Sequence, residues 1–454
     1  MAILLILAIL IGLPPVFAGY YQLNLAETLQ TGMEASLHYE SAARLLPWRS
    51  GLYEMAALAN RNEMERSMRL LLLAREKDTL SPAGQLALGD AYLANSNPQQ
   101  AVEEWNDLFA REVEIQNSAV RLTQFHHQTG DYGAETKILQ RWLILDPGNK
   151  VAGQKLGKLL ASEGSPDALA VLQTATQDDP NSQLEPLVAA LLESTSNRAY
   201  NLTRSGQALA GLGEWPLAEI AFQNAVNANA QYAEAWAWLG LARQQNQHKE
   251  ALAALEKALQ LQPNSPAIHT MLGTVLQQNG KLQEALEQFK IASQIEPENP
   301  AWWQAMGGAL APYDLPGAVQ SYVHAIKLAP ENASYWYALA VFCVENNAFL
   351  EEYGLSAALR AYALQPGNPD HMDILGRAQM AFGQTKEAEV MYKKAISASG
   401  PGNPTHIYML HLGLLYLQTG REAEAKSTLI QVKTLDPAGI YGLQAKKLLE
   451  RYFP

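Results

Sequence analysis

Histidine side chains are the groups in this chain best suited to bind a metal ion, but their spacing does not favour a metal site. The sequence has nine histidines and a single cysteine. His126 and His127 are adjacent, so on a helix their side chains diverge by about 100 degrees and cannot face one ion. His406 and His411 are five residues apart, whereas two ligands stacked on one helical face need a spacing of four. We therefore expect no metal and no cofactor.

Other chemical motifs are equally weak. Asp370, His371 and Asp373 lie at the start of a predicted helix, where carboxylates commonly cap the helix, and we interpret them as a capping group. The paired glycines of GTVLQQNG and GQALAGLG fall inside predicted helices and do not follow a strand, so they do not indicate a phosphate-binding loop. The sequence shows no Gly-x-Ser-x-Gly elbow and no nucleophile–base pair. These observations indicate a protein that is not an enzyme.

Aromatic residues cluster at the starts of three successive predicted helices. The clusters are Trp236 with Trp238, Trp302 with Trp303, and Tyr335 with Trp336 and Tyr337. One tryptophan in each cluster falls on a large residue that recurs along the chain, so we interpret Trp236, Trp303 and Trp336 as core residues. Their neighbours Trp238 and Tyr337 lie off the core positions, and exposed aromatic side chains are frequent binding anchors. We therefore select Trp238 and Tyr337 as candidate binding residues.

The elements that carry these residues repeat along the chain. The segment MLGTVLQQNGKLQEALEQFKIASQIEP contains a Leu-Gly pair, a second glycine, alanines around a large residue, and a final proline. The same skeleton returns around Gly240, Gly376 and Gly413, and Pro263 and Pro297 are 34 residues apart. A period of this length is typical of a helix–turn–helix unit that buries its apolar face only by stacking on its neighbours.

The residue types in the skeleton follow from helix packing. Small residues allow the two helices of a unit to cross closely, because a larger side chain would hold the backbones apart. Gly280, Gly383 and Gly420 are expected to end the first helices in a left-handed conformation. Proline ends the second helix because it cannot continue the hydrogen-bond ladder. No useful strand-like alternation occurs, so the sequence predicts an all-α fold.

These residues resemble the signature of the tetratricopeptide repeat family, W-x2-L-G-x2-Y…A-x3-F…P. The pattern returns in register seven times between Ala199 and Pro437, and more degenerate copies precede it. The resemblance implies an α-α superhelix, or solenoid, of about eleven helical hairpins whose first helices line a concave groove. The family likeness would place five candidate partner-binding residues in that groove: Trp238, Met271, Gln277, Tyr337 and Arg377. The Lys/Asn pattern with which some relatives hold a C-terminal carboxylate is missing, because the comparable positions include Thr270 and Leu410.

The predicted order of segments along the chain is a signal peptide or membrane anchor (1–18), a degenerate sub-array (19–180), a connecting helix or kink (181–198), a regular sub-array (199–437) and a capping helix (438–454). Extra residues around ENNAFLEEYG predict an enlarged loop in the copy that starts at Ala333.

The N-terminal segment differs from the repeats. Residues 2–13 are apolar apart from Gly12, and Val16 and Ala18 fit the small-residue exit of a signal peptide. The same run lies at the short edge of the length that spans a membrane. The absence of a leading Lys or Arg weakens both interpretations. A third interpretation is that the apolar N-terminal segment is the last membrane helix of a longer chain. The first two interpretations place the repeats outside the cytoplasm, tethered to the cell membrane by a single span or else secreted or periplasmic after cleavage near Ala18.

The net charge of the chain limits the kinds of partner that it can bind. The net charge of −12 and a pI near 5.3 argue against nucleic acid and against an anionic lipid surface, so membrane contact is expected through the N-terminal segment only. Our main hypothesis is a non-catalytic scaffold that binds partner protein segments in the groove. The alternative is that the chain is an accessory, or a detached C-terminal tail, of a polymerase or ligase that handles envelope polysaccharides or other glycans. The chain looks like the soluble arrays attached to such enzymes, and aromatic side chains stack on sugar rings.

Overall fold

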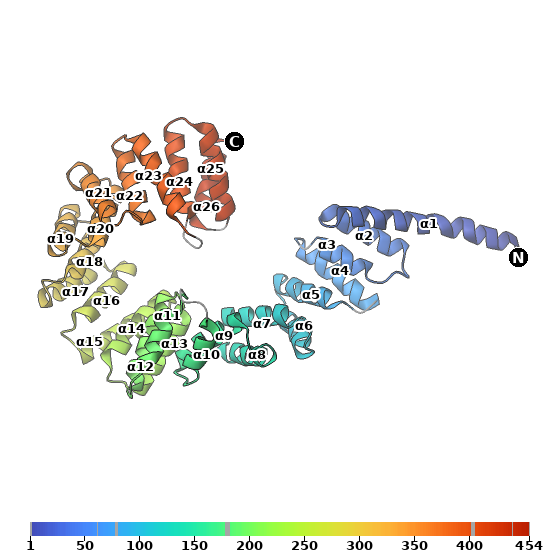
Figure 1. Ribbon diagram of the computed structural model, residues 1–454, viewed down its shortest axis with the longest axis horizontal. Helices are drawn as coiled ribbons and strands as arrows, with labels where there is room; N and C mark the ends of the chain where they lie inside the picture. Colours follow the sequence, from blue (N-terminus) through green and yellow to red (C-terminus); the bar gives the residue numbers. More distant parts are fainter. Residues whose placement is uncertain are drawn as a thin grey trace. The chain divides into compact units, whose positions relative to one another are not determined.

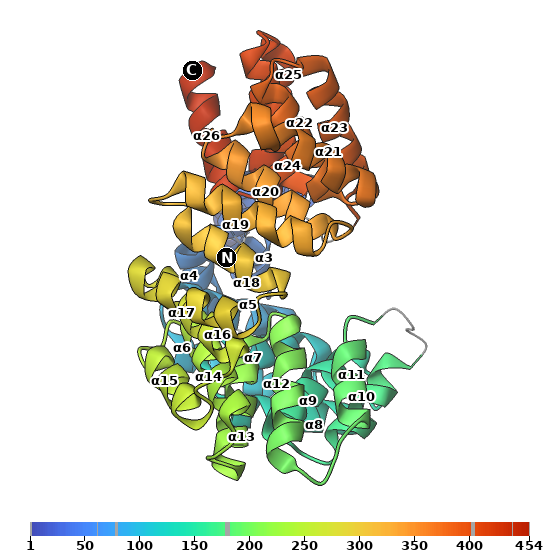
Figure 2. The same cartoon turned by 90° about the vertical axis from the view of Figure 1, so that its left-hand side faces the viewer.

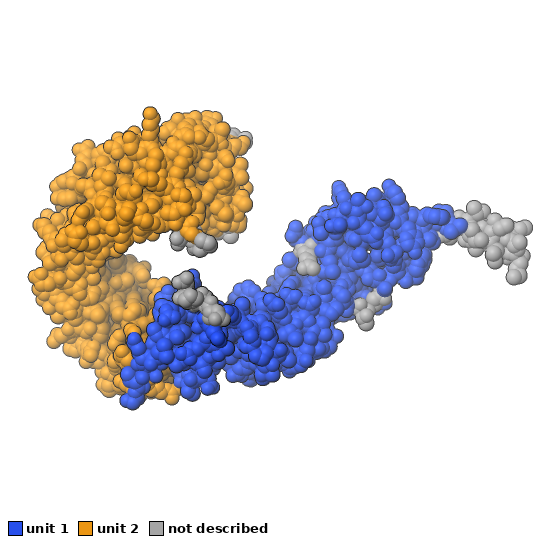
Figure 3. All heavy atoms as spheres, in the orientation of Figure 1, with its two compact units in different colours: residues 1–196, 211–213 blue, residues 197–210, 214–454 orange. Residues whose placement is uncertain are grey.

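The structure is a computed structural model that describes residues 2–60, 62–77, 80–177, 182–400, 405–437 and 439–453, with side chains in the first helix from Leu13 onwards. In this described part of the chain it has 26 α-helices, one π-helical turn and no strand, which confirms the predicted all-α class. The chain divides into two compact units, Met1–Ser196 with Gly211–Gly213, and Asn197–Ala210 with Glu214–Pro454 (Figures 1 and 3). The residue limits of the predicted sub-arrays stay predictions.

The first unit is a run of helical hairpins. Its helices are α1 (Ala2–Leu29), α2 (Met33–Leu45), α3 (Leu52–Ala59), α4 (Met64–Lys77), α5 (Pro82–Ala94), α6 (Pro98–Ala110), α7 (Ile115–Thr129), α8 (Tyr132–Leu145), α9 (Lys150–Glu163), α10 (Ala168–Thr176) and α11 (Glu185–Leu192). Each odd-numbered helix from α1 to α9 packs against the helix that follows it, and each hairpin also packs on the next one. The short α11 follows the last hairpin and contacts α10.

The second unit continues the same pattern. Its helices are α12 (Arg198–Gly211), α13 (Trp215–Ala228), α14 (Ala233–Gln245), α15 (Ala251–Leu261), α16 (Pro266–Gln278), α17 (Leu282–Ile295), α18 (Pro300–Leu310), α19 (Leu315–Leu328), α20 (Ala333–Glu345), α21 (Leu355–Leu364), α22 (Pro369–Ala381), α23 (Thr385–Ala398), α24 (Thr405–Gln418), α25 (Glu422–Leu435) and α26 (Ile440–Tyr452). The helices pair as hairpins, and the final helix α26 packs on α25 (Figure 2). Neighbouring first helices also touch, for example α20 with α22 and α22 with α24.

Glycines mark the crossing point inside eight of the hairpins. A Cβ added to Gly273 would lie 2.6 Å from the ring of Phe289, and one added to Gly376 would lie 2.7 Å from the ring of Tyr392. The same relation between a glycine and a large side chain 15 or 16 residues later joins Gly89 to Trp105, Gly157 to Leu172, Gly206 to Phe222, Gly240 to Leu255, Gly307 to Tyr322 and Gly413 to Leu429. The glycines therefore occupy matching places in successive hairpins, as the repeat predicts.

In seven of these eight hairpins the residue seven positions after the crossing glycine is left-handed; the exception is Asp314 in the α18–α19 turn, with φ of −141°. Gly280, Gly383 and Gly420 have φ values of +74°, +73° and +71°, which confirms their predicted role at the end of the first helix. The equivalent place in another hairpin holds Gln247, with φ of 60°. A residue with a side chain is less stable than glycine in the left-handed region, so packing between the helices, and not glycine alone, imposes this turn geometry.

Tryptophans at the starts of first helices hold consecutive hairpins together. Each donates its indole N–H to the backbone carbonyl six residues earlier: Trp236 to Ala230 (2.9 Å), Trp303 to Pro297 (2.9 Å) and Trp336 to Pro330 (2.7 Å). His269 occupies the same place in its repeat, with its Nε2 2.8 Å from the carbonyl oxygen of Pro263. These tryptophans are half-buried against the apolar core, so they belong to the fold, as the sequence predicts.

The extra residues near ENNAFLEEYG form a wider turn of helix. The π-helical turn η1 (Leu350–Gly354) leads directly into α21, and Phe349 before it has φ of 54°. A π-helical turn adds a residue without breaking the backbone ladder, so the insertion is absorbed within the second helix.

The first helix runs without a break past the predicted cleavage site at Ala18. Beyond that site Leu23 and Ala26 are buried among the side chains of α2 and α3, and a Cβ on Gly19 would lie 2.6 Å from Leu46. The latter half of α1 is thus the first helix of the first hairpin. The predicted anchor or signal lies mostly in residues 1–12, whose side chains are outside the described residues. Among the helices searched over the described residues, none is long and apolar enough to cross a membrane.

Candidate interaction site on the first helices

Polar and aromatic side chains meet on three adjacent first helices of the second unit, α20, α22 and α24. We call this group the α20–α22–α24 cluster, and its members are Tyr337, Asp370, Asp373, Arg377, Tyr408 and His411. Asp370, Asp373 and Arg377 follow one another at spacings of three and four, which places them on one face of α22.

Two carboxylates of α22 are each contacted by a side chain of α24. Tyr408 donates its hydroxyl to Oδ1 of Asp370 at 2.8 Å, and Nδ1 of His411 lies 2.7 Å from Oδ1 of Asp373. Asp373 is only 6% exposed, whereas Asp370 lies at the surface. The cluster therefore contains one shielded acid–imidazole pair and one carboxylate that solvent or a partner can reach.

The α20 side of the cluster is aromatic and weakly ion-paired. The ring of Tyr337 lies 5.3 Å from the ring of His371, centroid to centroid. Arg377 places a guanidinium nitrogen 3.8 Å from a carboxylate oxygen of Glu345, whose side chain is well exposed. Tyr337 and Arg377, two of the five residues predicted from the sequence, thus lie in the same cluster.

The environment keeps the tyrosines protonated. Burial, reinforced by the negative charges of Asp370 and Asp373, raises the pKa of Tyr337 to about 12. Burial and the hydrogen bond to Asp370 raise the pKa of Tyr408 as well. Burial lowers the pKa of His371, so this imidazole is predominantly neutral at physiological pH. The site consequently offers neutral phenol groups beside carboxylates, which suits recognition by hydrogen bonds and charge.

The other three predicted residues lie on earlier repeats. Trp238 on α14 is half-buried and stacks on Phe222, with ring centroids 5.8 Å apart. Met271 on α16 is partly buried against the apolar core. Gln277 donates its amide to the carbonyl of Gly308 at 3.0 Å and so connects α16 to α18. The structure thus gives each of these three a packing contact, and their role in binding stays a prediction.

Four members of the cluster are not predicted from the sequence: Asp370, Asp373, Tyr408 and His411. The sequence predicts a capping role for Asp370 and Asp373, but the side chain of Asn368 caps α22 by accepting a hydrogen bond from the backbone N–H of Asp370 at 2.9 Å. The two carboxylates bond across to Tyr408 and His411 instead. The spacing of three and four along α22 was the available signal, because it predicts a shared face.

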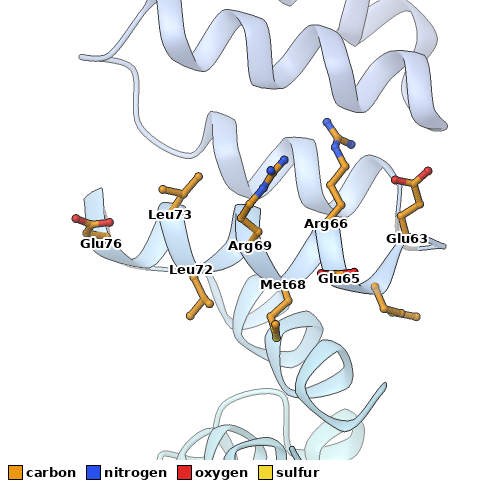
Figure 4. Close-up of a pocket in the computed structure, with 9 residues that line it drawn as sticks. Glu63, Glu65, Arg66, Met68, Arg69, Leu72, Leu73 and Glu76 are labelled. Carbon is orange, nitrogen blue, oxygen red and sulfur yellow. The ribbon is translucent and has the colours of Figure 1, made fainter. Parts of the chain in front are cut away.

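The first unit has an open cavity elsewhere. A hollow of about 770 Å³ lies over α4 and is lined by Glu63, Met64, Glu65, Arg66, Met68, Arg69, Leu72, Leu73 and Glu76 (Figure 4). Arg66 contacts Ser36 at 2.6 Å and Glu40 at 2.5 Å, so its charge is already paired within the fold. None of the five predicted residues lines this hollow.

No metal centre accompanies these features among the residues that the structure describes. They contain no group of three or more His, Cys, Asp or Glu side chains arranged to hold a metal ion.

Comparisons with known proteins agree with the repeat. Profiles described as tetratricopeptide repeat match residues 86–150, 203–266, 242–307 and 407–438. The comparison with curated proteins finds no match.

Solved structures that match this chain include the following three. PilF of Pseudomonas aeruginosa is 20% identical, with 47% of this chain and 96% of that one covered and a TM-score of 0.37. A tetratricopeptide repeat protein from Parabacteroides merdae is 15% identical, with 56% and 98% covered and a TM-score of 0.44. YrrB, a TPR protein with an unusual peptide-binding site, is 23% identical, with 42% and 96% covered and a TM-score of 0.31. The paired helices, the matching glycines and the four matched regions together show that this chain is a tetratricopeptide repeat protein.

Proposed function

We propose that this protein is a non-catalytic scaffold that binds a segment of a partner protein on the first helices of its second unit. We further propose that its N-terminal segment tethers it to a membrane, with the repeats on the extracytoplasmic side. The observation that carries the binding proposal is the α20–α22–α24 cluster, where polar side chains from three repeats converge.

We infer that the stacking of α22 on α24 does not depend on the polar bonds of this cluster, although those bonds join the two helices. Burying a carboxylate costs free energy unless it is paired, and an apolar residue at the position of Asp373 would pack between helices without that cost. The pair between Asp373 and His411 therefore favours a role in recognition over a role in stability. This reasoning supports the first-helix face, and not the second helices, as the place where a partner lies.

The charges of the cluster indicate the chemistry of the partner. Asp370 and Asp373 contribute two carboxylates, Arg377 contributes one permanent positive charge, and Glu345 beside the cluster adds a third carboxylate. Glu345 and Asp370 are accessible, so a Lys or Arg side chain of an extended segment could pair with them. Tyr337 would pack beside that segment as a half-buried aromatic anchor.

A display experiment tests the binding proposal. Random peptides are selected on the full chain, and the dissociation constants of the enriched peptides are measured for the wild type and for Asp370→Asn. Asparagine keeps the oxygen that accepts the hydrogen bond from Tyr408 but removes the charge. We expect enrichment of Lys- and Arg-containing peptides and an increase of about tenfold in the dissociation constant, the equivalent of one charge-assisted hydrogen bond.

A matched control removes a carboxylate outside the cluster. Glu331 is exposed and pairs with Arg360 at 2.8 Å, so Glu331→Gln is expected to leave peptide affinity unchanged. Equal affinities for the wild type and Asp370→Asn would refute the cluster as the binding site. Flotation of the full chain with phosphatidylcholine vesicles tests the tether separately, and a chain that stays at the bottom of the gradient would refute it.

No observation favours the alternative of a glycan-machinery accessory. The aromatic faces that would stack on sugar rings include Trp303 and Trp336, which are half-buried and bonded to the backbone.

A further inference from the structure

We infer that the exposed face of α1, together with the turn after α2, is an aromatic collar that lies in the interfacial layer of a phospholipid bilayer. The collar consists of Leu13, Phe17, Tyr20, Tyr21 and Trp48. In this arrangement the first hairpin of the array rests directly on the membrane surface. The inference rests on the tether proposed above and adds to it the residues that contact lipid headgroups.

The collar residues are unusually exposed for their type. Their exposed fractions are 45% for Leu13, 69% for Phe17, 47% for Tyr20, 63% for Tyr21 and 62% for Trp48. The opposite face of the same helix is closed, because Gly19 and Leu23 pack against α2. α1 thus uses one face for the fold and leaves an apolar face without a partner inside the described chain.

Trp48 belongs to the same surface although it comes from a different element. It lies in the turn between α2 and α3, and its neighbour Arg49 places its guanidinium 5.9 Å from the ring centre of Tyr20. Tyrosine and tryptophan side chains favour the membrane–water interface, where the ring is partly apolar and its polar atom stays hydrated. A cation beside them suits the same layer, because it can meet lipid phosphate.

The polarity of the exposed face changes along the helix and not around it. From Leu13 to Tyr21 the exposed residues of α1 are apolar or aromatic, whereas the exposed ones that follow are Asn24, Glu27, Thr28 and, at the last position, Leu29. The sequence has no charged residue before Glu27. A change from apolar to polar along the axis is expected of a helix that leaves a bilayer, whereas a protein partner on one side would require a lengthwise stripe.

The dimensions agree with this placement. Phe17 and Tyr21 are four residues apart, so they span about 6 Å of helix axis, close to the depth of one interfacial layer. The part of α1 before Phe17 would extend about 22 Å further, within the hydrocarbon thickness of about 30 Å. Because α1 continues without a break into the first hairpin, the position of its apolar end would also set the position of the first repeats.

Site-specific fluorescence in membranes tests the collar. Phe17→Cys, Tyr21→Cys and Trp48→Cys variants of the full chain are labelled with an environment-sensitive maleimide dye and bound to phosphatidylcholine vesicles. The native Cys343 is buried, and burial raises the pKa of its thiol to about 12, so the unmodified chain serves as the labelling blank. Ile144→Cys on α8 is the control, since Ile144 is 77% exposed and lies outside the collar.

We expect a blue shift at the three collar positions, and loss of emission when the lipids carry bromine near the headgroup end of their acyl chains. The Ile144 label is expected to show neither change. Vesicle-bound protein in which the labels at positions 17 and 48 behave like the label at 144 would overturn the collar while leaving the tether standing. A shift that depends on protein concentration but not on vesicles would also overturn it, since a second copy of the chain would then cover the face.

Discussion

Two adjacent glycines in α18 allow the crossing-point interpretation to be tested with a single type of substitution. A Cβ on Gly307 would lie 2.9 Å from the ring of Tyr322, a buried side chain of α19. A Cβ on Gly308 would meet its nearest neighbour, the hydroxyl of the same tyrosine, at 3.5 Å, which is ordinary contact. The two positions therefore share the same helix and differ in the space available.

The expected magnitude follows from two terms. Replacing a helical glycine by alanine stabilises the helix by about 1 kcal/mol at either position. At Gly307 the added methyl group also overpacks the crossing, which costs about 1–3 kcal/mol. Because the helix term is common to both variants, Gly307→Ala should be less stable than Gly308→Ala by about 1–3 kcal/mol. Gly308→Ala itself should be as stable as the wild type or more so.

Hydrogen exchange followed by mass spectrometry is the suitable measurement. A long repeat array does not unfold in one cooperative step, so a single melting temperature would mix several events. Peptides covering α18 and α19 report the local opening free energy directly. Equal protection of these peptides in the two variants would refute the claim that Tyr322 fills the space a side chain at 307 would need.

Three further predictions concern the turns, the links between hairpins and pH. Gln247→Gly should stabilise the α14–α15 turn by about 0.5–1 kcal/mol, because relief of the strain at the left-handed residue exceeds the entropic cost of glycine. Hydrogen exchange in that turn should become slower than in the wild type. Trp336→Phe should destabilise the start of α20 by about 1 kcal/mol through loss of the bond to Pro330, seen as faster exchange there than in the wild type. The hydrogen bond from Arg421, and after it the one from Lys393, lowers the pKa of Glu389 from 4.5 to about 2. The charged Glu389 carboxylate therefore stabilises the fold above about pH 4.5, and this stabilisation is lost as the pH falls towards 2. Glu389→Gln should be less stable near neutral pH and should lose less stability over that acid range. Hydrogen exchange of peptides covering α23, corrected at each pH for the intrinsic exchange rate, measures this local stability, and equal pH profiles for the variant and the wild type would contradict the prediction.

The sequence by itself determined the repeating unit. Gly273 and Phe289 are 16 residues apart and meet within a single hairpin, so the constraint on their sizes is local and recurs visibly along the chain. The left-handed turn glycines are likewise local, since each ends the helix in which it sits. The all-α class and the family resemblance follow from these short-range patterns.

Tertiary structure alone decided which side chains meet across repeats. Tyr408 and Asp370 are 38 residues apart, as are His411 and Asp373, and their contact depends on the rotation between stacked hairpins. That rotation results from the summed packing of many side chains and leaves no periodic mark at the individual positions. The N-terminal helix shows the same limit: its apolar run predicts an anchor or signal peptide in residues 1–18, and only the packing of Gly19 against Leu46 shows that the same helix continues into the first repeat.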